Sequence, residues 1–147
     1  LKSSGIFYKF IMKIIKIGLD TEDIWNEQGS LREVFRELSL ATDKYELFIV
    51  TKSTNTELID SIALSIGMDS SNVFHSIESD LLINEKLSLL NIDIFLSGDY
   101  SLVKLVNDDQ TVAQALVVDS KQDSFSIQPL WFTKFKFWID KVGKLND

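Results

Sequence analysis

A hydrophobic segment that runs directly into acidic residues is the feature that most constrains the fold of this chain. Residues 14–19 alternate apolar side chains with Lys16 and Gly18, a period of two that is typical of a β-strand. The segment continues without a break into Asp20 and Glu22. Open α/β sheets bind ligands at the carboxyl ends of their strands. The segment therefore predicts a strand that delivers carboxylates to a binding edge.

The rest of the chain alternates predicted strands and helices. A nearly continuous apolar run at 45–51 is typical of a strand buried on both faces, as in a parallel sheet covered by helices. Further strands are predicted at 72–77, 93–98 and 111–118, and helices at 30–40, 54–66, 84–90, 102–107 and from 129 onward. This alternation predicts one doubly wound, three-layer α/β domain with a mainly parallel sheet.

Length sets the domain organisation. The chain has 147 residues, enough for one domain with a substantial core. We expect residues 12–147 to form this single domain, with Met12 opening the first strand. Residues 1–11 are interpreted as an N-terminal extension or a cloning remnant.

Composition excludes several classes of function. The chain has no cysteine, which rules out a disulfide scaffold, a cysteine nucleophile and a thiolate metal site. A net charge of −7 argues against a broad surface for nucleic acid or anionic membranes. The apolar runs are shorter than the roughly 20 residues of a membrane-spanning helix. We therefore expect a cytoplasmic protein that binds neither nucleic acid nor membrane.

Polar residues end three of the predicted strands. The first strand ends in Asp20 with Glu22, the second in Thr51, and a later one in Gly98 and Asp99. In a parallel sheet these endings share one edge. Two carboxylates that converge there form an oxygen-rich site of the kind that Mg²⁺ prefers, and a hydroxyl and a lysine nearby would neutralise a phosphate.

This order of motifs resembles the haloacid dehalogenase-like phosphatase superfamily. The first motif of that family is a hydrophobic strand followed by Asp-x-Asp, and residues 17–22 read Ile-Gly-Leu-Asp-Thr-Glu. Its second motif is a strand ending in Thr or Ser, here at Thr51. Its third is a lysine, for which Lys86 is the candidate and Lys52 a substitute. Its fourth is a strand followed by Gly-Asp, here ending at Asp99.

The resemblance implies a Mg²⁺-dependent phosphoric monoester hydrolase. Asp20 would be the nucleophile and Glu22 the general acid and base. Asp20 and Asp99 would hold Mg²⁺, and Thr51 and Lys86 would bind the phosphoryl group of a phosphorylated small molecule or phosphoprotein. The short spacing between Asp20 and Thr51 implies a member without a large cap.

The chain also departs from the pattern of that family, which leaves alternatives open. Glu22 replaces the second aspartate, and Val103 and Lys104 stand where a further acid follows the fourth motif. One alternative is a catalytically inactive relative that acts as a protein-interaction module. Another is a receiver-like or other doubly wound binding domain. In a receiver, a later strand would end in an acid at the position of Thr51.

Overall fold

The computed structural model describes residues 14–22, 30–118 and 130–145. In these residues a single five-stranded sheet is parallel throughout, with the strand order β3-β2-β1-β4-β5. The strands are β1 (Ile15–Leu19), β2 (Tyr45–Val50), β3 (Val73–Phe74), β4 (Ile94–Ser97) and β5 (Gln114–Val117). The helices are α2 (Ser30–Leu40), α3 (Thr56–Ile66), the short 3₁₀ turn η1 (Ser70–Asn72), α4 (Asp80–Leu89), α5 (Tyr100–Asp108) and α7 (Leu130–Leu145).

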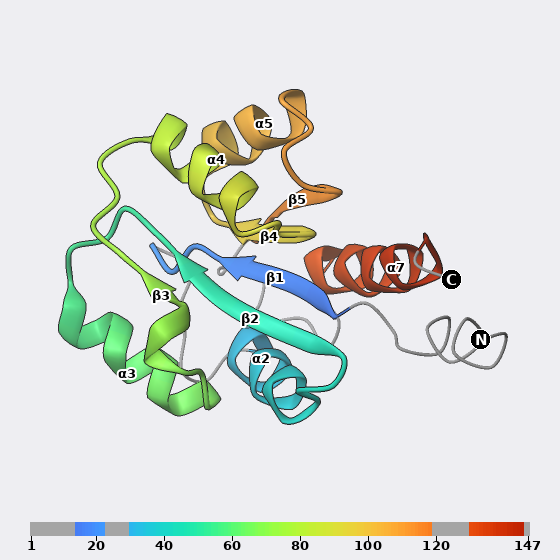
Figure 1. The fold of residues 1–147 in the computed structure, drawn as a ribbon, viewed down its shortest axis with the longest axis horizontal. Helices are drawn as coiled ribbons and strands as arrows, with labels where there is room; N and C mark the ends of the chain where they lie inside the picture. Colours follow the sequence, from blue (N-terminus) through green and yellow to red (C-terminus); the bar gives the residue numbers. More distant parts are fainter. Residues whose placement is uncertain (1–13, 23–29, 119–129, 146–147) are drawn as a thin grey trace, which may run out of the picture.

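One face of the sheet packs against α2 and α7 (Figure 1). Ile17 and Leu19 of β1 are fully buried in a cluster with Phe35 of α2 and Phe135 of α7. The rings of Phe35 and Phe135 stack with their centroids 6.3 Å apart. The odd-numbered positions of β1 thus serve this face, as the alternation of its sequence predicts.

The opposite face packs against α4 and α5 (Figure 1). Leu87 of α4 and Val106 of α5 are buried with Phe95 of β4. Gly18 allows Phe95 and Leu87 to pack closely against β1 on this face. A Cβ at position 18 would lie 3.2 Å from the ring of Phe95 and 3.4 Å from Leu87. The three-layer α/β architecture predicted from the sequence is confirmed. No helix in the described ranges is both long enough and apolar enough to cross a membrane.

The order in which successive strands are added to the sheet reverses at β1, which makes it the topological switch point. β2 and β3 extend to one side of β1, whereas β4 and β5 extend to the other. Ligands of open α/β sheets bind in the crevice at such a switch point. Receiver domains have the flavodoxin-like order 2-1-3-4-5, so the receiver-like alternative is wrong for this chain.

Helix α4 begins earlier than the sequence pattern indicated. The predicted helix 84–90 starts in the structure at Asp80, because Ser79 caps it by accepting a hydrogen bond from Leu82 N at 3.2 Å. The earlier start matters for function, since it brings Asp80 to the carboxyl edge of the sheet. Residues 1–11 and Pro129, the predicted start of the last helix, lie outside the described ranges.

The free edge of β5 is covered by a side chain. Ala115 pairs with Phe95 of β4 in register, yet its backbone N–H and C=O face the other way. Asn107 Oδ1 accepts the N–H at 2.8 Å and Asn107 Nδ2 donates to the C=O at 3.0 Å. The amide of Asn107 thus takes the place of a peptide group in a neighbouring strand. Unpaired strand edges invite pairing with other chains, and this contact closes the edge at its centre.

We expect Asn107→Ala to lower the free energy of unfolding by about 1–3 kcal/mol, because the Ala115 N–H loses its partner. The Ala115 C=O keeps a second donor, Gln114 Nε2 at 3.0 Å. Urea denaturation measures the loss, and hydrogen exchange at the Ala115 amide reports whether it is local. The neighbouring change Asp108→Ala is a matched control. It removes an exposed ion pair with Lys104, which water and salt screen, so we expect little loss of stability. Equal losses in the two variants would contradict the assigned role of Asn107.

Candidate active site at the switch point

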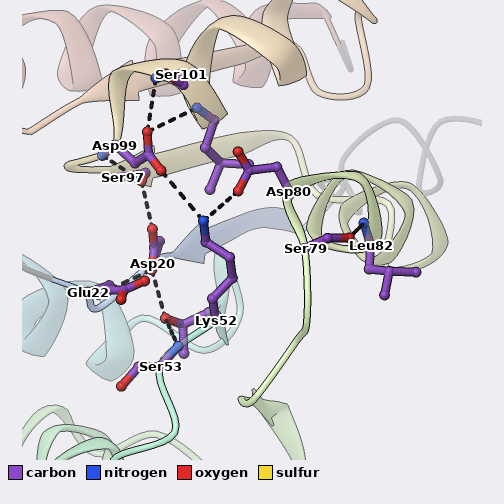
Figure 2. Close-up of polar contacts among 12 residues, drawn as sticks. Asp20, Glu22, Lys52, Ser53, Ser79, Asp80, Leu82, Ser97, Asp99 and Ser101 are labelled. Atoms are coloured by element: carbon purple, nitrogen blue, oxygen red, sulfur yellow. Dashed lines mark hydrogen bonds and ion pairs between the residues drawn. The ribbon is translucent and has the colours of Figure 1, made fainter.

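The end of the central strand lies between the ends of its two neighbours. β1 pairs with β2 through Leu19 and Ile49 and with β4 through Leu19 and Leu96. The residues that follow these strands therefore meet at one edge of the sheet (Figure 2). Asp20 N also donates to Leu96 O at 2.8 Å, which carries the pairing one residue beyond β1 and fixes the backbone of Asp20.

Asp20 is a buried carboxylate held by two hydroxyls. Thr51 Oγ1 donates to Asp20 Oδ1 at 2.7 Å, and Ser97 Oγ donates to Asp20 Oδ2 at 2.7 Å. The backbone N–H of Glu22 donates to Oδ1 at 3.1 Å. Asp20 is only 1% exposed. Each carboxylate oxygen thus has a donor from a different strand end, as a buried acidic group requires.

Burial raises the pKa of the Asp20 carboxyl above its ordinary value of 3.8. The loss of hydration disfavours the charged form and is the largest influence. The hydroxyls of Ser97 and Thr51, the amide of Glu22 and the charge of Lys52 act in the opposite direction and favour the carboxylate. Burial therefore destabilises the ionised form of Asp20, and the surrounding donors partly stabilise it.

A lysine lies between two further carboxylates at the same edge. Lys52 follows Thr51 directly, and its Nζ lies 2.7 Å from Asp80 Oδ1 and 3.7 Å from Asp99 Oδ2 (Figure 2). The hydrogen bond to Asp80 is the main reason that the pKa of Lys52 is raised. The charges of Asp80, Asp99 and Glu22 add to this effect. Lys52 is therefore protonated across the physiological range.

Asp99 is tied both to helix α5 and to Asp20. Its Oδ1 caps the helix by accepting from Ser101 N at 3.0 Å and Leu102 N at 3.3 Å. Its own N–H donates to Ser97 Oγ at 3.0 Å, and that hydroxyl in turn donates to Asp20. Ser97 thus links the Asp20 carboxylate to the backbone of Asp99, the two residues for which the sequence predicts a shared site.

The structure brings together most of the residues singled out from the sequence. Asp20 and Thr51 are in direct contact, and the backbone of Asp99 reaches Asp20 through Ser97. Glu22 reaches Asp20 through its backbone amide, while the residue is exposed. Lys86 instead lies over the ring of Phe74 at the end of β3. Lys52 supplies the cation beside Asp99.

Lys86 lies in a groove beside the end of β3. Its Nζ lies 4.1 Å from the ring centroid of Phe74. It lines a groove of about 540 Å³ beside the end of β3 and α4, together with Leu82 and Leu89. None of the residues that line this groove is Asp20, Thr51 or Asp99. A cation–π contact with Phe74 explains why the lysine faces this way.

Three residues of the site were missed or undervalued in the sequence. Ser97 is a fully buried hydroxyl within an apolar strand, directly before Gly98-Asp99, and that contrast is a usable signal. Asp80 carries no such signal, because its position depends on the Ser79 cap and on the packing of α4. Nothing in the local sequence distinguishes Lys52 from other lysines that follow strands, because its partners Asp80 and Asp99 are distant in the chain.

The donor chemistry of the site fits Mg²⁺. The described residues contain no group of three or more metal-ligating side chains. Mg²⁺, however, is usually held by one or two carboxylates together with water and substrate phosphate. Asp20 and Asp99 supply two carboxylates at this edge, and Ser97 joins the Asp20 carboxylate to the backbone of Asp99. These two aspartates are the residues that would hold the ion.

Fold and site together define a three-layer α/β domain with a polar cluster at its switch point. No protein-family model matches the chain, and no curated protein matches it in sequence. Among solved structures it is similar to a protein assigned as a UDP-N-acetylglucosamine 2-epimerase from Listeria monocytogenes, with a TM-score of 0.51 and 16% identity. The match covers 92% of this chain and 37% of that one, so this chain spans less than half of that protein. At this identity the likeness shows the fold alone.

Asp20 makes stability depend on pH in a specific direction. A carboxyl whose pKa is raised on folding binds its proton more tightly in the folded state, so stability falls as pH rises from 3.8 through the raised value. We expect the free energy of unfolding of wild type, relative to Asp20→Asn, to decrease over this window and to level off above it. Urea denaturation of both proteins across acidic to neutral pH measures the difference. A wild type that gains stability relative to the variant as pH rises would contradict this assignment.

Proposed function

We propose that this domain is a Mg²⁺-dependent phosphoric monoester hydrolase that works through an aspartyl-phosphate at Asp20. One observation carries the proposal, namely the meeting of a carboxylate, two hydroxyls and an ammonium at the switch point of the sheet. The hydroxyls of Thr51 and Ser97 each lie 2.7 Å from Asp20. Lys52 and Asp99 lie on the same edge. This combination suits the binding and transfer of a phosphoryl group.

In the proposed reaction, an oxygen of Asp20 attacks phosphorus as the bond between phosphorus and the leaving oxygen breaks. The hydroxyls of Thr51 and Ser97 turn from the carboxylate to the phosphoryl oxygens, and Lys52 offsets their negative charge. Glu22 gives a proton to the leaving oxygen. The chemistry that Mg²⁺ supplies when bound is to reduce the repulsion between the carboxylate and the phosphate.

The second half of the reaction restores the enzyme. Glu22, now ionised, takes a proton from a water molecule, and the resulting hydroxide attacks the phosphorus of the aspartyl-phosphate. The bond between Asp20 and phosphorus breaks, so inorganic phosphate leaves and the carboxylate is regenerated. The substrate class is a phosphorylated small molecule or phosphoprotein, acted on in the cytoplasm.

The nucleophile can be tested directly. We expect purified protein to hydrolyse an aryl phosphate in the presence of Mg²⁺ and Asp20→Asn to lose at least about a thousandfold of kcat, because the amide cannot form the intermediate. Asp108→Asn, which alters an exposed ion pair on α5, is the matched control and should keep full activity. Turnover that survives in Asp20→Asn would rule out the aspartyl-phosphate.

The choice of lysine gives a second test. We expect Lys52→Met to lower kcat/KM by about ten- to a hundredfold, because the phosphoryl charge loses its nearest cation. Lys86→Met should leave kcat/KM unchanged, since Lys86 contacts Phe74. Steady-state kinetics on both variants measures the contrast. A loss of kcat/KM in Lys86→Met but not in Lys52→Met would show that Lys86 is the phosphate-binding lysine.

The burial of Asp20 favours a second candidate function. At 1% exposure, with both oxygens already bonded, Asp20 also suits a purely structural role. The domain would then be a catalytically inactive relative that acts as a protein-interaction module. In that case wild type shows no Mg²⁺-dependent turnover, and Asp20→Asn leaves partner binding intact while substitutions on the surface abolish it.

A further inference from the structure

The ammonium of Lys52 lies beside the carboxylate oxygen of Asp99 that does not cap helix α5. Asp99 has two carboxylate oxygens, and Oδ1 is engaged by the backbone of α5. Oδ2 is the oxygen that faces Lys52 Nζ, at 3.7 Å. An ion that binds Asp99 through Oδ2 would therefore meet a positive charge on the same carboxylate.

Lys52 is held in this position by a contact outside the predicted metal pair. Its shortest ion pair is with Asp80 Oδ1 at 2.7 Å, and Asp80 is fixed in the first turn of α4. The side chains of Lys52 and Asp80 are only about a third exposed, at 30% and 32%. Partly sheltered charges are screened less by water and salt than fully exposed ones. Asp80 thus keeps the ammonium close to Asp99.

Two cations cannot share this position at low cost. The repulsion between an ammonium and a dication a few ångströms apart is considerable at the effective dielectric of a partly buried site. Lysine has a flexible four-carbon stem, so its ammonium can move away from Asp99. Binding of Mg²⁺ must then either displace the ammonium or tolerate its repulsion.

We propose that Lys52 is a resident competitor for the metal position, whose ammonium beside Asp99 weakens Mg²⁺ binding until it turns away. The inference rests on the proposed function in one respect, namely that Asp20 and Asp99 are the metal-binding pair. It adds a residue that sets metal affinity. It also gives Lys52 two opposed effects, because the charge that helps to bind phosphate hinders the binding of Mg²⁺.

Calorimetric titration of the whole chain with Mg²⁺, without substrate, tests the proposal. We expect Lys52→Met to bind Mg²⁺ at least about tenfold more tightly than wild type, because the competing charge is gone. Lys104→Met is the matched control, since Lys104 also has an aspartate at 2.7 Å but lies on the exposed side of α5. Its affinity should equal that of wild type. Asp99→Asn added to Lys52→Met should abolish the gain.

An unchanged or weaker affinity in Lys52→Met would overturn the proposal, as would an equal gain in Lys104→Met. If Lys52→Met does not fold, the rate of reductive methylation of each lysine in wild type replaces the titration. Saturating Mg²⁺ should speed methylation of Lys52 at least about threefold and leave Lys104 unchanged. An unchanged Lys52 rate would overturn the proposal. Because these readouts measure binding, a gain in affinity without phosphatase turnover would support the role of Lys52 and count against the proposed reaction alone.

Discussion

The pairing of β1 between β2 and β4 is the constraint on which the site depends. It places the residue after β1 within reach of the residues that end both neighbours, so Asp20 meets Thr51 on one side and Ser97 on the other. A buried carboxylate without such donors would cost several kcal/mol. The hydroxyls offset that cost only while the three strands keep their register. The hydrogen bonds of the site therefore depend on the pairing of the three strands.

Charge is distributed unevenly over this arrangement. Asp20 is balanced mainly by neutral donors, whereas Asp80 and Asp99 share the ammonium of Lys52. Ser97 joins the two halves, because its hydroxyl accepts from Asp99 N and donates to Asp20. A shift of the Asp99 backbone can thus reach Asp20 through one side chain. Such a network tolerates rearrangement only when each lost partner is replaced by another.

The fold and half of the site follow from sequence patterns of short range. Strand alternation and apolar runs predict the parallel sheet, and residues that directly follow strands, such as Asp20, Thr51 and Asp99, share its edge whatever the details of packing. Asp80 and Lys52 depend on where α4 begins and how it lies, which involves long-range packing. Lys86 depends on a contact with the ring of Phe74 that no local pattern encodes. The sequence therefore predicts poorly those contacts in which a side chain of one element meets a side chain of another.

The burial of Asp20 can be reconciled with a reactive carboxylate. Without a phosphate, the hydroxyls of Thr51 and Ser97 keep the ionised form of Asp20 tolerable in a position that raises its pKa. A phosphoryl group carries more charge and more acceptor oxygens than a carboxylate, so it can draw the same hydroxyls away. The carboxylate would then lose its donors as phosphorus comes within reach, which makes it a stronger nucleophile at that moment. In the proposed reaction, the contacts that stabilise the unliganded fold would thus also prepare Asp20 for its role as nucleophile.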